Sequence, residues 1–151
     1  MSLLEARSSD PQIRVFVYRY IVENGRPPTV AETAIGMGLP PDDVQAAYGR
    51  LHDGHALLLE PGANTIRMAW PFSGVPTPFR VQVNGCRYWA NCAWDALGIP
   101  ALLQADARIE SVFADTGEAA TLTVADARVR GQAVAHFAVP FCRWYADIVF
   151  T

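Results

Sequence analysis

The chain has 151 residues, of which 51% are hydrophobic and 18% are charged, and its formal net charge is −3. This composition predicts a folded globular protein with one sizeable core, or with a small and a medium module, and no disordered tail. The negative charge argues against broad electrostatic binding to nucleic acid. No apolar run reaches the roughly 18 residues of a membrane span, and no secretory signal is evident.

The three cysteines, Cys86, Cys92 and Cys142, stand at irregular spacing. An odd number without a C-x-x-C pair argues against a disulfide framework and a structural zinc site, and it favours free thiols in a reducing cytoplasm. A free cysteine is most often a small buried apolar residue, so a functional role needs further support.

Residues 1–70 are predicted to form a small helical module. Apolar residues recur at helical spacing after Asp10, the expected N-cap of a first helix. Thr29 and Glu32 form a capping box for a second helix, and a third spans about 41–52. The runs ALLLE and TIRMAW, joined by PGAN, predict a hairpin. Three helices and a hairpin describe a winged helix-turn-helix.

The third predicted helix argues against DNA binding by this module. A recognition helix normally offers Arg, Lys, Asn or Gln to bases and phosphates. This helix instead begins with Asp42 and Asp43, and Gln45 and Arg50 follow. A packing role is therefore favoured, with DNA contact as the alternative.

Residues 71–78 are rich in Pro and Gly and predict a linker. Alternating apolar residues then predict strands in FRVQV and CRYWA, joined by an NG turn, and in ARIESVFA and ATLTVA, which flank DTGE. RVRGQAVAHFAVP continues this β character, and FCRWYADIVFT is expected as a strand, or as a short helix that leads into a strand. Residues 79–151 are thus predicted to form a mainly antiparallel β domain with one buried helix, which makes the chain α+β.

The buried helix is predicted in YWANCAWDALGIPALL, with Asn91 as N-cap and Gly98 with Pro100 as its stop. Cys92 is then expected in the first turn, where free N–H groups and the helix dipole stabilise a thiolate. Asp95 is expected on the same face, one turn further on. Cys92 is accordingly predicted to have a depressed pKa and to be the most reactive thiol.

Apolar neighbours are expected to keep this site dry, and Trp89 and Trp94 are the predicted walls of a substrate pocket. Burial disfavours charge, so the carboxyl group of Asp95 is expected to stay protonated. A thiolate binds a soft metal, and a neighbouring acid can protonate a leaving carbon. This is the chemistry that cleaves a carbon–metal bond. The alternative is that Cys92 is a core thiol and Asp95 a local cap or ion-pair partner.

The stretch 88–124, from YWANCAWDAL to ATLTV, resembles the core segment of the alkylmercury (organomercurial) lyase family, and the winged-helix-like module also fits that family. The resemblance implies that Cys92 matches the first catalytic, mercury-binding cysteine. It also implies that Asp95 matches the aspartate that takes part in protonating the departing carbon. The implied products are inorganic mercury and a hydrocarbon.

Two departures from the family pattern affect the predicted site. The family's second cysteine is expected farther along the chain than Cys142, beyond Thr151, so the C-terminal domain is expected to be incomplete. Cys142 is the alternative second metal ligand. Asn91 stands where an aromatic residue is expected, so the pocket is expected to be altered.

Other candidate ligands carry weaker expectations. His52 and His55 lie at a predicted helix end and are expected on the solvated surface. Cys86 follows the NG turn and is expected to be structural, with a peripheral metal contact as the alternative.

Three functions are consistent with these patterns. The leading one is an organomercurial lyase-like protein with Cys92 as metal-binding thiolate and Asp95 as proton donor. The alternatives are a soft-metal-binding protein without lyase activity, and a metal-responsive winged-helix DNA-binding regulator. The expected partner is a small organomercurial or a soft metal ion, rather than nucleic acid or a membrane. No cofactor is expected, the expected location is the cytoplasm, and the oligomeric state is left open.

Overall fold

The computed structural model describes residues 9–137 and 139–149, except for the side chain of Phe141. Helices α2 (Asp10–Asn24), α3 (Val30–Met37) and α4 (Pro41–Asp53) come first, and helix α5 (Ala93–Leu103) and the 3-10 helix η1 (Phe141–Ala146) come later. The strands are β1 (Leu58–Leu59), β2 (Ile66–Ala69), β3 (Phe72–Ser73), β4 (Phe79–Val83), β5 (Cys86–Ala90), β6 (Ala107–Val112), β7 (Ala119–Ala125) and β8 (Arg128–Arg130).

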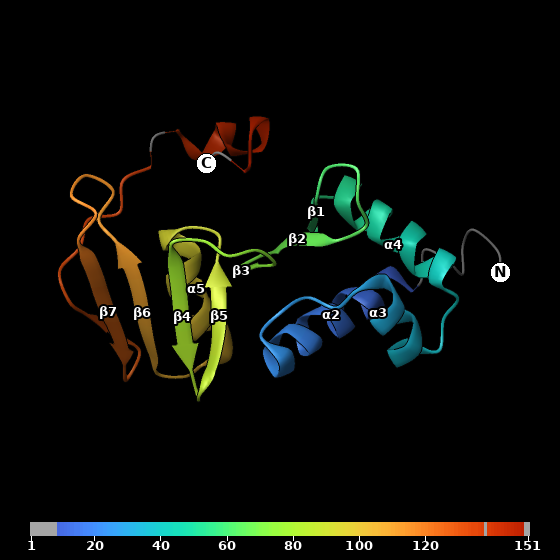
Figure 1. Cartoon of the computed structure of the whole chain (residues 1–151), viewed down its shortest axis with the longest axis horizontal. Helices are drawn as coiled ribbons and strands as arrows, with labels where there is room; N and C mark the ends of the chain where they lie inside the picture. The colour runs from blue at the N-terminus through green and yellow to red at the C-terminus, as the bar shows by residue number, and fades with distance from the viewer. Residues whose placement is uncertain (1–8, 138, 150–151) are drawn as a thin grey trace.

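All eight strands belong to one sheet in the order β1-β2-β3-β5-β4-β6-β7-β8, and every neighbouring pair is antiparallel. Figure 1 shows α2, α3 and α4 at one end of the molecule, β4 to β7 at the other, and β2 and β3 between them. The predicted α+β class is confirmed. No helix in the described ranges is long and apolar enough to cross a lipid bilayer.

The N-terminal helices follow their predicted capping signals, with one exception. The capping box is present, because Thr29 Oγ1 accepts a hydrogen bond from the backbone N–H of Glu32 at 3.1 Å and the Glu32 carboxylate accepts from the N–H of Thr29 at 2.8 Å. Asp10, however, is the first helical residue and Ser9 the N-cap. The Asp10 carboxylate forms an ion pair with Arg50 of α4 at 2.7 Å instead, which joins the first and third helices.

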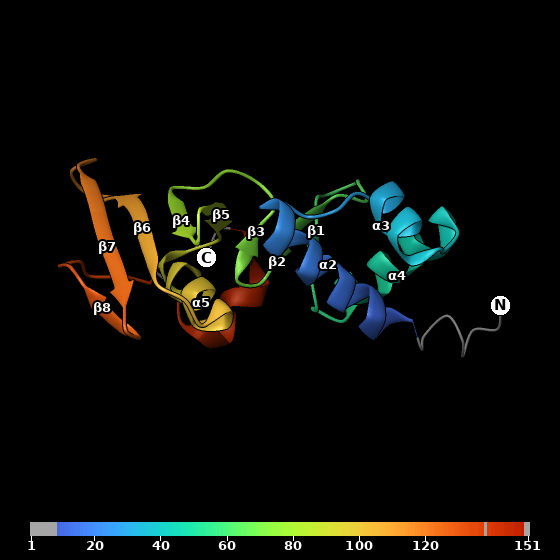
Figure 2. The same ribbon diagram turned by 90° about the horizontal axis from the view of Figure 1, so that it is seen from below.

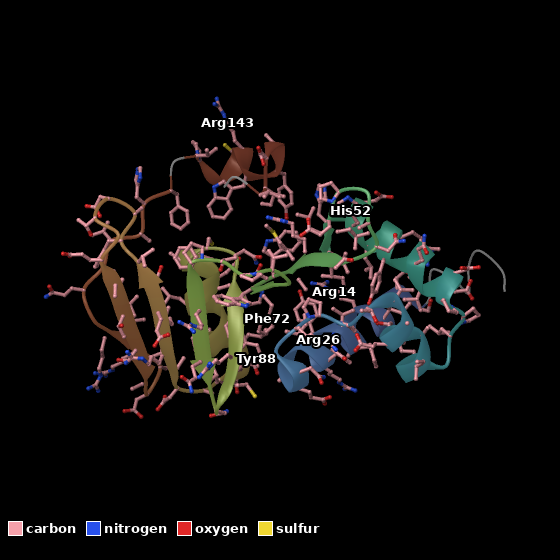
Figure 3. The ribbon with its side chains drawn as sticks, viewed as in Figure 1. Arg14, Arg26, His52, Phe72, Tyr88 and Arg143 are labelled. Carbon is pink, nitrogen blue, oxygen red and sulfur yellow. The ribbon has the colours of Figure 1, made fainter. Side chains whose placement is uncertain are left out.

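Part of the predicted linker is a buried strand. Within 71–78, Phe72 and Ser73 form β3, which pairs with β2 on one side and β5 on the other. The Phe72 side chain is 1% exposed, and its ring centroid lies 5.3 Å from that of Tyr88 (Figure 3). The proline-rich flanks suggested a loop, but burial of this aromatic ring favours a short strand. The predicted hairpin, β1–β2, is thereby continued into the second half of the chain.

Helix α5 covers one face of the C-terminal strands and lies behind β4 and β5 in Figure 1; Figure 2 shows the same packing from below. The predicted NG turn joins these strands, with Asn84 at φ 50° and Gly85 at φ 83°. The buried residues alternate with exposed or half-buried ones along β4, β5 and β6; the buried ones are Val81, Val83, Tyr88, Ala90, Ala107 and Ile109. This confirms the predicted alternation.

The last part of the chain departs from the β prediction. Strand β8 covers only Arg128–Arg130, and residues 131–137 lie outside any strand. Of the two alternatives for FCRWYADIVFT, the structure has a short helix, η1, while residues 150–151 lie outside the described ranges.

Candidate active site

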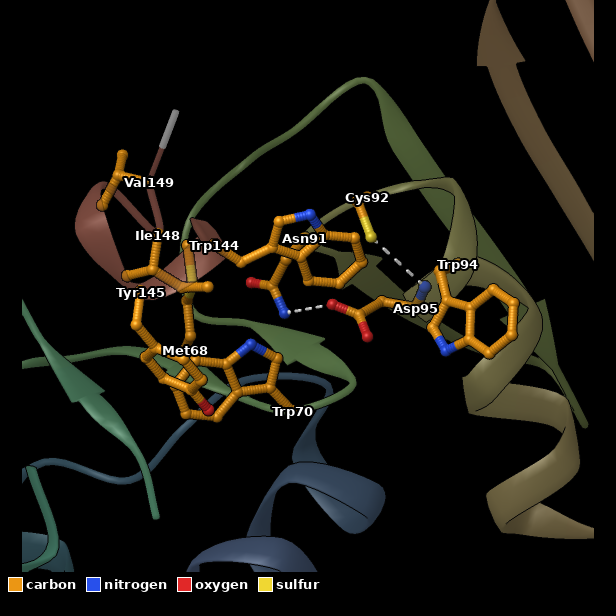
Figure 4. A pocket seen from close by; sticks show the side chains of 10 residues that line it. All are labelled: Met68, Trp70, Asn91, Cys92, Trp94, Asp95, Trp144, Tyr145, Ile148 and Val149. Carbon is orange, nitrogen blue, oxygen red and sulfur yellow. Dashed lines mark hydrogen bonds between the residues drawn. The ribbon is translucent and has the colours of Figure 1, made fainter. Parts of the chain in front are cut away.

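The turn from β5 into α5 carries the candidate site (Figure 4). Cys92 is itself the N-cap of α5, with φ −152° and ψ −179°, and its sulfur accepts a hydrogen bond from the backbone N–H of Asp95 at 3.5 Å. The expectation that Asn91 caps the helix and that Cys92 lies in the first turn is therefore wrong by one residue. The short side chain of Cys92 takes the role of a capping acceptor.

Helix α5 also continues beyond its predicted stop. Gly98 and Pro100 lie inside the helix, which ends at Leu103. Pro100 removes one intrahelical hydrogen bond, but the residue is buried, and burial of α5 against the sheet outweighs that loss. Gly98 serves close packing rather than termination, because a Cβ added there would lie 3.2 Å from the Cβ of Pro71.

Burial sets the protonation of the two reactive groups. It raises the pKa of the Cys92 thiol, and the nearby negative charge of Asp95 raises it further, although backbone N–H groups oppose the change. The predicted depressed pKa of Cys92 is therefore wrong in direction. Burial likewise raises the pKa of the Asp95 carboxyl group, while hydrogen bonds from Asn91 and from the Cys92 thiol lower it. The direction of this shift agrees with the expectation for Asp95, and its protonation at neutral pH stays a prediction.

Asn91 was missed as a partner of the carboxyl group. Its Nδ2 donates a hydrogen bond to Oδ2 of Asp95 at 2.9 Å, and it lies 3.3 Å from the carbonyl oxygens of both Pro71 and Phe72. The i, i+4 spacing of Asn91 and Asp95 was visible in the sequence. The contact between Asn91 and the start of β3 was not visible in the sequence, because residues 71–78 were predicted to form a linker.

The thiol and the carboxyl group open into a cavity of about 230 Å³ (Figure 4). Three separate segments line it, namely β2, the start of α5 and the C-terminal segment. The lining residues are Met68, Trp70, Asn91, Cys92, Trp94, Asp95, Trp144, Tyr145, Ile148 and Val149. A strand of the N-terminal hairpin thus contributes to the same site as the catalytic candidates.

The C-terminal segment is held over the cavity by aromatic contacts. The Tyr145 ring stacks on His55 at a centroid distance of 4.5 Å and meets Trp70 edge-on at 6.5 Å. His55 is exposed as expected, but it also packs against this segment. His52 has a structural role, because its Nδ1 accepts a hydrogen bond from the N–H of Leu59 at 3.3 Å.

The remaining predicted site residues are divided between the cavity and other surfaces. Trp94 lines the cavity and is 67% exposed. Trp89 does not line it, because it points to the opposite face of the sheet from Tyr88, where the Arg80 guanidinium lies 5.9 Å from its ring centroid. Successive side chains of a strand point to opposite faces of the sheet, so Trp89 and Tyr88 cannot face the same side. The predicted pocket did not take this alternation into account.

The other two cysteines also lie outside the cavity lining. Cys142 is exposed on η1, although Trp144 and Tyr145 nearby do line the cavity. Cys86 is half-buried on β5 and packs against the hydrophobic core. Among the residues that the structure describes, no group of three or more His, Cys, Asp or Glu residues could hold a metal ion. Cys92 is the one cysteine that lines this cavity within the described ranges.

The fold and the site define an α+β protein in which a half-buried thiol and a half-buried carboxyl group share an aromatic-walled cavity. The alkylmercury lyase family matches residues 72–150, and the chain belongs to that family. A search of curated proteins found no match.

Among solved structures, the chain is similar to a mercury-bound form of MerB2, with a TM-score of 0.65 and 24% sequence identity. The similarity covers 81% of this chain and 58% of that one, so the chain spans less than two thirds of the length of MerB2. At this identity the similarity establishes the fold.

Proposed function

We propose that this protein binds an organomercurial through Cys92 and cleaves its carbon–mercury bond with a proton delivered by Asp95. The observation that carries the proposal is the placement of both groups at one turn, in one half-buried cavity. Membership of the alkylmercury lyase family supports it. The aromatic side chains of Trp70, Trp94 and Trp144 would contact the organic group of the substrate.

Binding exchanges a proton for mercury. The organomercurial cation bonds to the sulfur of Cys92 as the thiol loses its proton, because thiolates prefer soft metals. The Asp95 carboxylate accepts this proton, since Cys92 and Asp95 lie at the same helix turn, where the Cys92 sulfur accepts a hydrogen bond from the Asp95 N–H at 3.5 Å. The proton therefore stays inside the site and is available for the next step.

Cleavage returns the proton to carbon. The electron pair of the carbon–mercury bond takes the proton from Asp95, so a carbon–hydrogen bond forms as the carbon–mercury bond breaks. The hydrocarbon leaves, Asp95 is again a carboxylate, and Hg(II) remains on Cys92. A second thiolate on mercury would donate electron density and weaken its bond to carbon. With Cys142 outside the cavity lining, we propose a small soluble thiol as this second sulfur.

The test measures phenylmercury binding and benzene release with excess small thiol. Cys92→Ser is expected to lose both, whereas Asp95→Asn should bind phenylmercury and release little benzene. Cys86→Ser is the matched control, since Cys86 lies outside the cavity lining, and it should retain both activities. Stoichiometric binding of phenylmercury by Cys92→Ser would contradict the proposal.

One observation favours a second candidate, a soft-metal-binding protein without lyase activity. Cys92 is the single cysteine of the described cavity lining, and one thiolate can bind mercury without activating its bond to carbon. In that case the protein would bind Hg(II) and phenylmercury stoichiometrically but release no benzene at any concentration of small thiol. Benzene release that disappears in Asp95→Asn would exclude this candidate.

A further inference from the structure

The side chain of Asn91 lies between the carboxyl group of Asp95 and the chain at the start of β3. Its Nδ2 has three acceptors within reach, which are Oδ2 of Asp95 at 2.9 Å and the carbonyl oxygens of Pro71 and Phe72, each at 3.3 Å. An amide nitrogen carries two hydrogens, so one serves Asp95 and the two carbonyl oxygens share the other. Asn91 therefore links the reactive carboxyl group to the backbone of another element. Figure 4 shows its hydrogen bond to Asp95.

The orientation of this amide is fixed by its surroundings. Exchanging its oxygen and nitrogen would place Oδ1 against two carbonyl oxygens and a carboxyl oxygen, and all of these contacts would repel. In the observed orientation, Oδ1 of Asn91 is buried and has no hydrogen-bond partner among the described residues. An unsatisfied buried acceptor is destabilising. The three acceptors around the nitrogen explain why this cost is tolerated.

The hydrogen bond from Asn91 acts on both the place and the charge of Asp95. It holds Oδ2, and it leaves the other carboxyl oxygen free of Asn91. A hydrogen bond donated to a carboxyl oxygen favours the charged form, so the amide, 2.9 Å from Oδ2, favours the carboxylate that must accept a thiol proton. A leucine at this position would have a similar size, but it could neither hold the Asp95 carboxyl group in place nor favour its charged form.

We infer that Asn91 is a positioning residue for proton transfer, which anchors Asp95 to β3 so that its carboxylate can accept the Cys92 proton and return it to carbon. This inference rests on the proposed lyase function. Asn91 itself need not touch the substrate, and its effect on the reaction is exerted through Asp95.

The first experiment is independent of lyase activity. The pKa of Asp95 is measured by carboxyl-carbon NMR titration of the ligand-free protein, in the wild type, Asn91→Leu and Thr77→Val. Thr77 is the matched control, because its hydroxyl donates to the carbonyl oxygen of Ala90 at 2.6 Å, at the same end of β5, rather than to Asp95. Asn91→Leu should raise the pKa of Asp95, and Thr77→Val should leave it unchanged.

The second experiment measures benzene release from phenylmercury by the same proteins over a range of pH. Asn91→Leu should lower kcat by about 100-fold with little change in KM, the scale of loss expected when a catalytic group is misplaced. The acidic limb of the kcat/KM profile should move to higher pH, because this profile reports the free enzyme, in which the carboxylate then forms at higher pH. A purely structural role would not move that limb.

The outcomes distinguish a failure of the positioning role of Asn91 from a failure of the proposed lyase function. An unchanged Asp95 pKa in Asn91→Leu, or equal shifts in Asn91→Leu and Thr77→Val, would overturn the role of Asn91. If the wild type releases no benzene but Asn91→Leu still raises the pKa of Asp95, the lyase proposal fails while the anchoring of Asp95 stands. Should Asn91→Leu fail to fold, Asn91→Ala replaces it. Loss of the amide donor should likewise raise the pKa of Asp95, and an unchanged pKa would overturn the role of Asn91.

Discussion

The thiol of Cys92 and the carboxyl group of Asp95 share one environment, and burial raises the pKa of both. The resting site therefore favours the neutral thiol over the thiolate. An N-cap position near free N–H groups would by itself favour the thiolate, but burial and the nearby carboxylate outweigh it. Under the proposed function, the reactive thiolate would form on contact with mercury rather than be present beforehand.

Alkylation tests this directly. At pH 7, iodoacetamide should modify the exposed Cys142 faster than the half-buried Cys92, as followed by peptide mapping. Asp95→Asn removes the negative charge beside the thiol, so the pH at which Cys92 becomes reactive should fall. Asp115→Asn, in the turn after β6, should leave that pH unchanged. Faster alkylation of Cys92 than of Cys142 in the wild type would contradict the raised pKa.

Stability should also depend on the charge of Asp95. Its pKa is raised in the folded protein, so the folded state binds a proton more tightly than the unfolded chain does. Stability is then greatest below the ordinary carboxyl pKa and falls as pH rises through the raised pKa. Asp95→Asn removes the buried charge, so its Tm should exceed that of the wild type more at pH 8 than at pH 4. Equal differences at both pH values would show that Asp95 is not destabilised by burial.

At the scale of single elements, α5 illustrates how packing overrides local signals. Gly98 lies in contact distance of Pro71, whereas Gly49 of α4 has no atom within 4 Å of a Cβ added there. Both are glycines within helices, yet they should respond oppositely to larger side chains. The two positions differ because Pro71 packs against Gly98 and no described residue packs against Gly49, which cannot be read from the sequence of either helix.

The matched prediction compares Gly98→Val with Gly49→Ala. Gly98→Val should lower the free energy of unfolding by about 1–3 kcal/mol, as overpacking in a filled site does. It should also disturb the site, because Pro71 supplies a carbonyl acceptor to Asn91. Gly49→Ala should raise the free energy of unfolding by about 0.5–1 kcal/mol, because alanine favours the helix. Urea denaturation measures both, and a stabilising Gly98→Val would show that α5 does not pack closely on Pro71.

Elements with local signals were predictable from the sequence, and elements that depend on distant contacts were not. The Thr29–Glu32 capping box and the Asn84–Gly85 turn are encoded within a few residues, and both are present. The pairing of Cys92 with Asp95 was predictable for the same reason. Strand β3 and the closure of the cavity by Tyr145 depend on partners far along the chain, so composition alone suggested a linker and left the segment around Tyr145 undecided.

At the scale of the whole molecule, β3 makes one sheet out of two predicted modules. It joins β2, which belongs to the N-terminal hairpin, to β5, which leads into the site. Tyr88 of β5 adds a second link, since its hydroxyl donates to the carbonyl oxygen of Val22 in α2 at 2.8 Å. The helical module and the C-terminal sheet should therefore unfold as one cooperative unit.

Phe72 is the residue on which this coupling depends most. Its ring is 1% exposed and contacts Tyr18 of α2 and Tyr88 of β5, at centroid distances of 6.4 Å and 5.3 Å. In the wild type, far-UV circular dichroism, which follows mainly the helices, and tryptophan fluorescence, which reports the junction and the C-terminal half, should give coincident unfolding curves in urea. Phe72→Ala should lower the free energy of unfolding by about 3–5 kcal/mol and separate the two curves.

The control for this prediction is Phe113→Ala, which truncates a half-buried phenylalanine just after β6, away from the junction. Phe113→Ala should lower the free energy of unfolding by less than Phe72→Ala does, and its circular dichroism and fluorescence curves should stay coincident. Phe72→Ala should also weaken phenylmercury binding. The cavity is lined by Met68 and Trp70 from the N-terminal hairpin and by Cys92 at the start of α5, so it needs both parts in place. Two separate transitions in the wild type, or coincident curves in Phe72→Ala, would show that β3 does not couple the two parts and that the site can form without the N-terminal module.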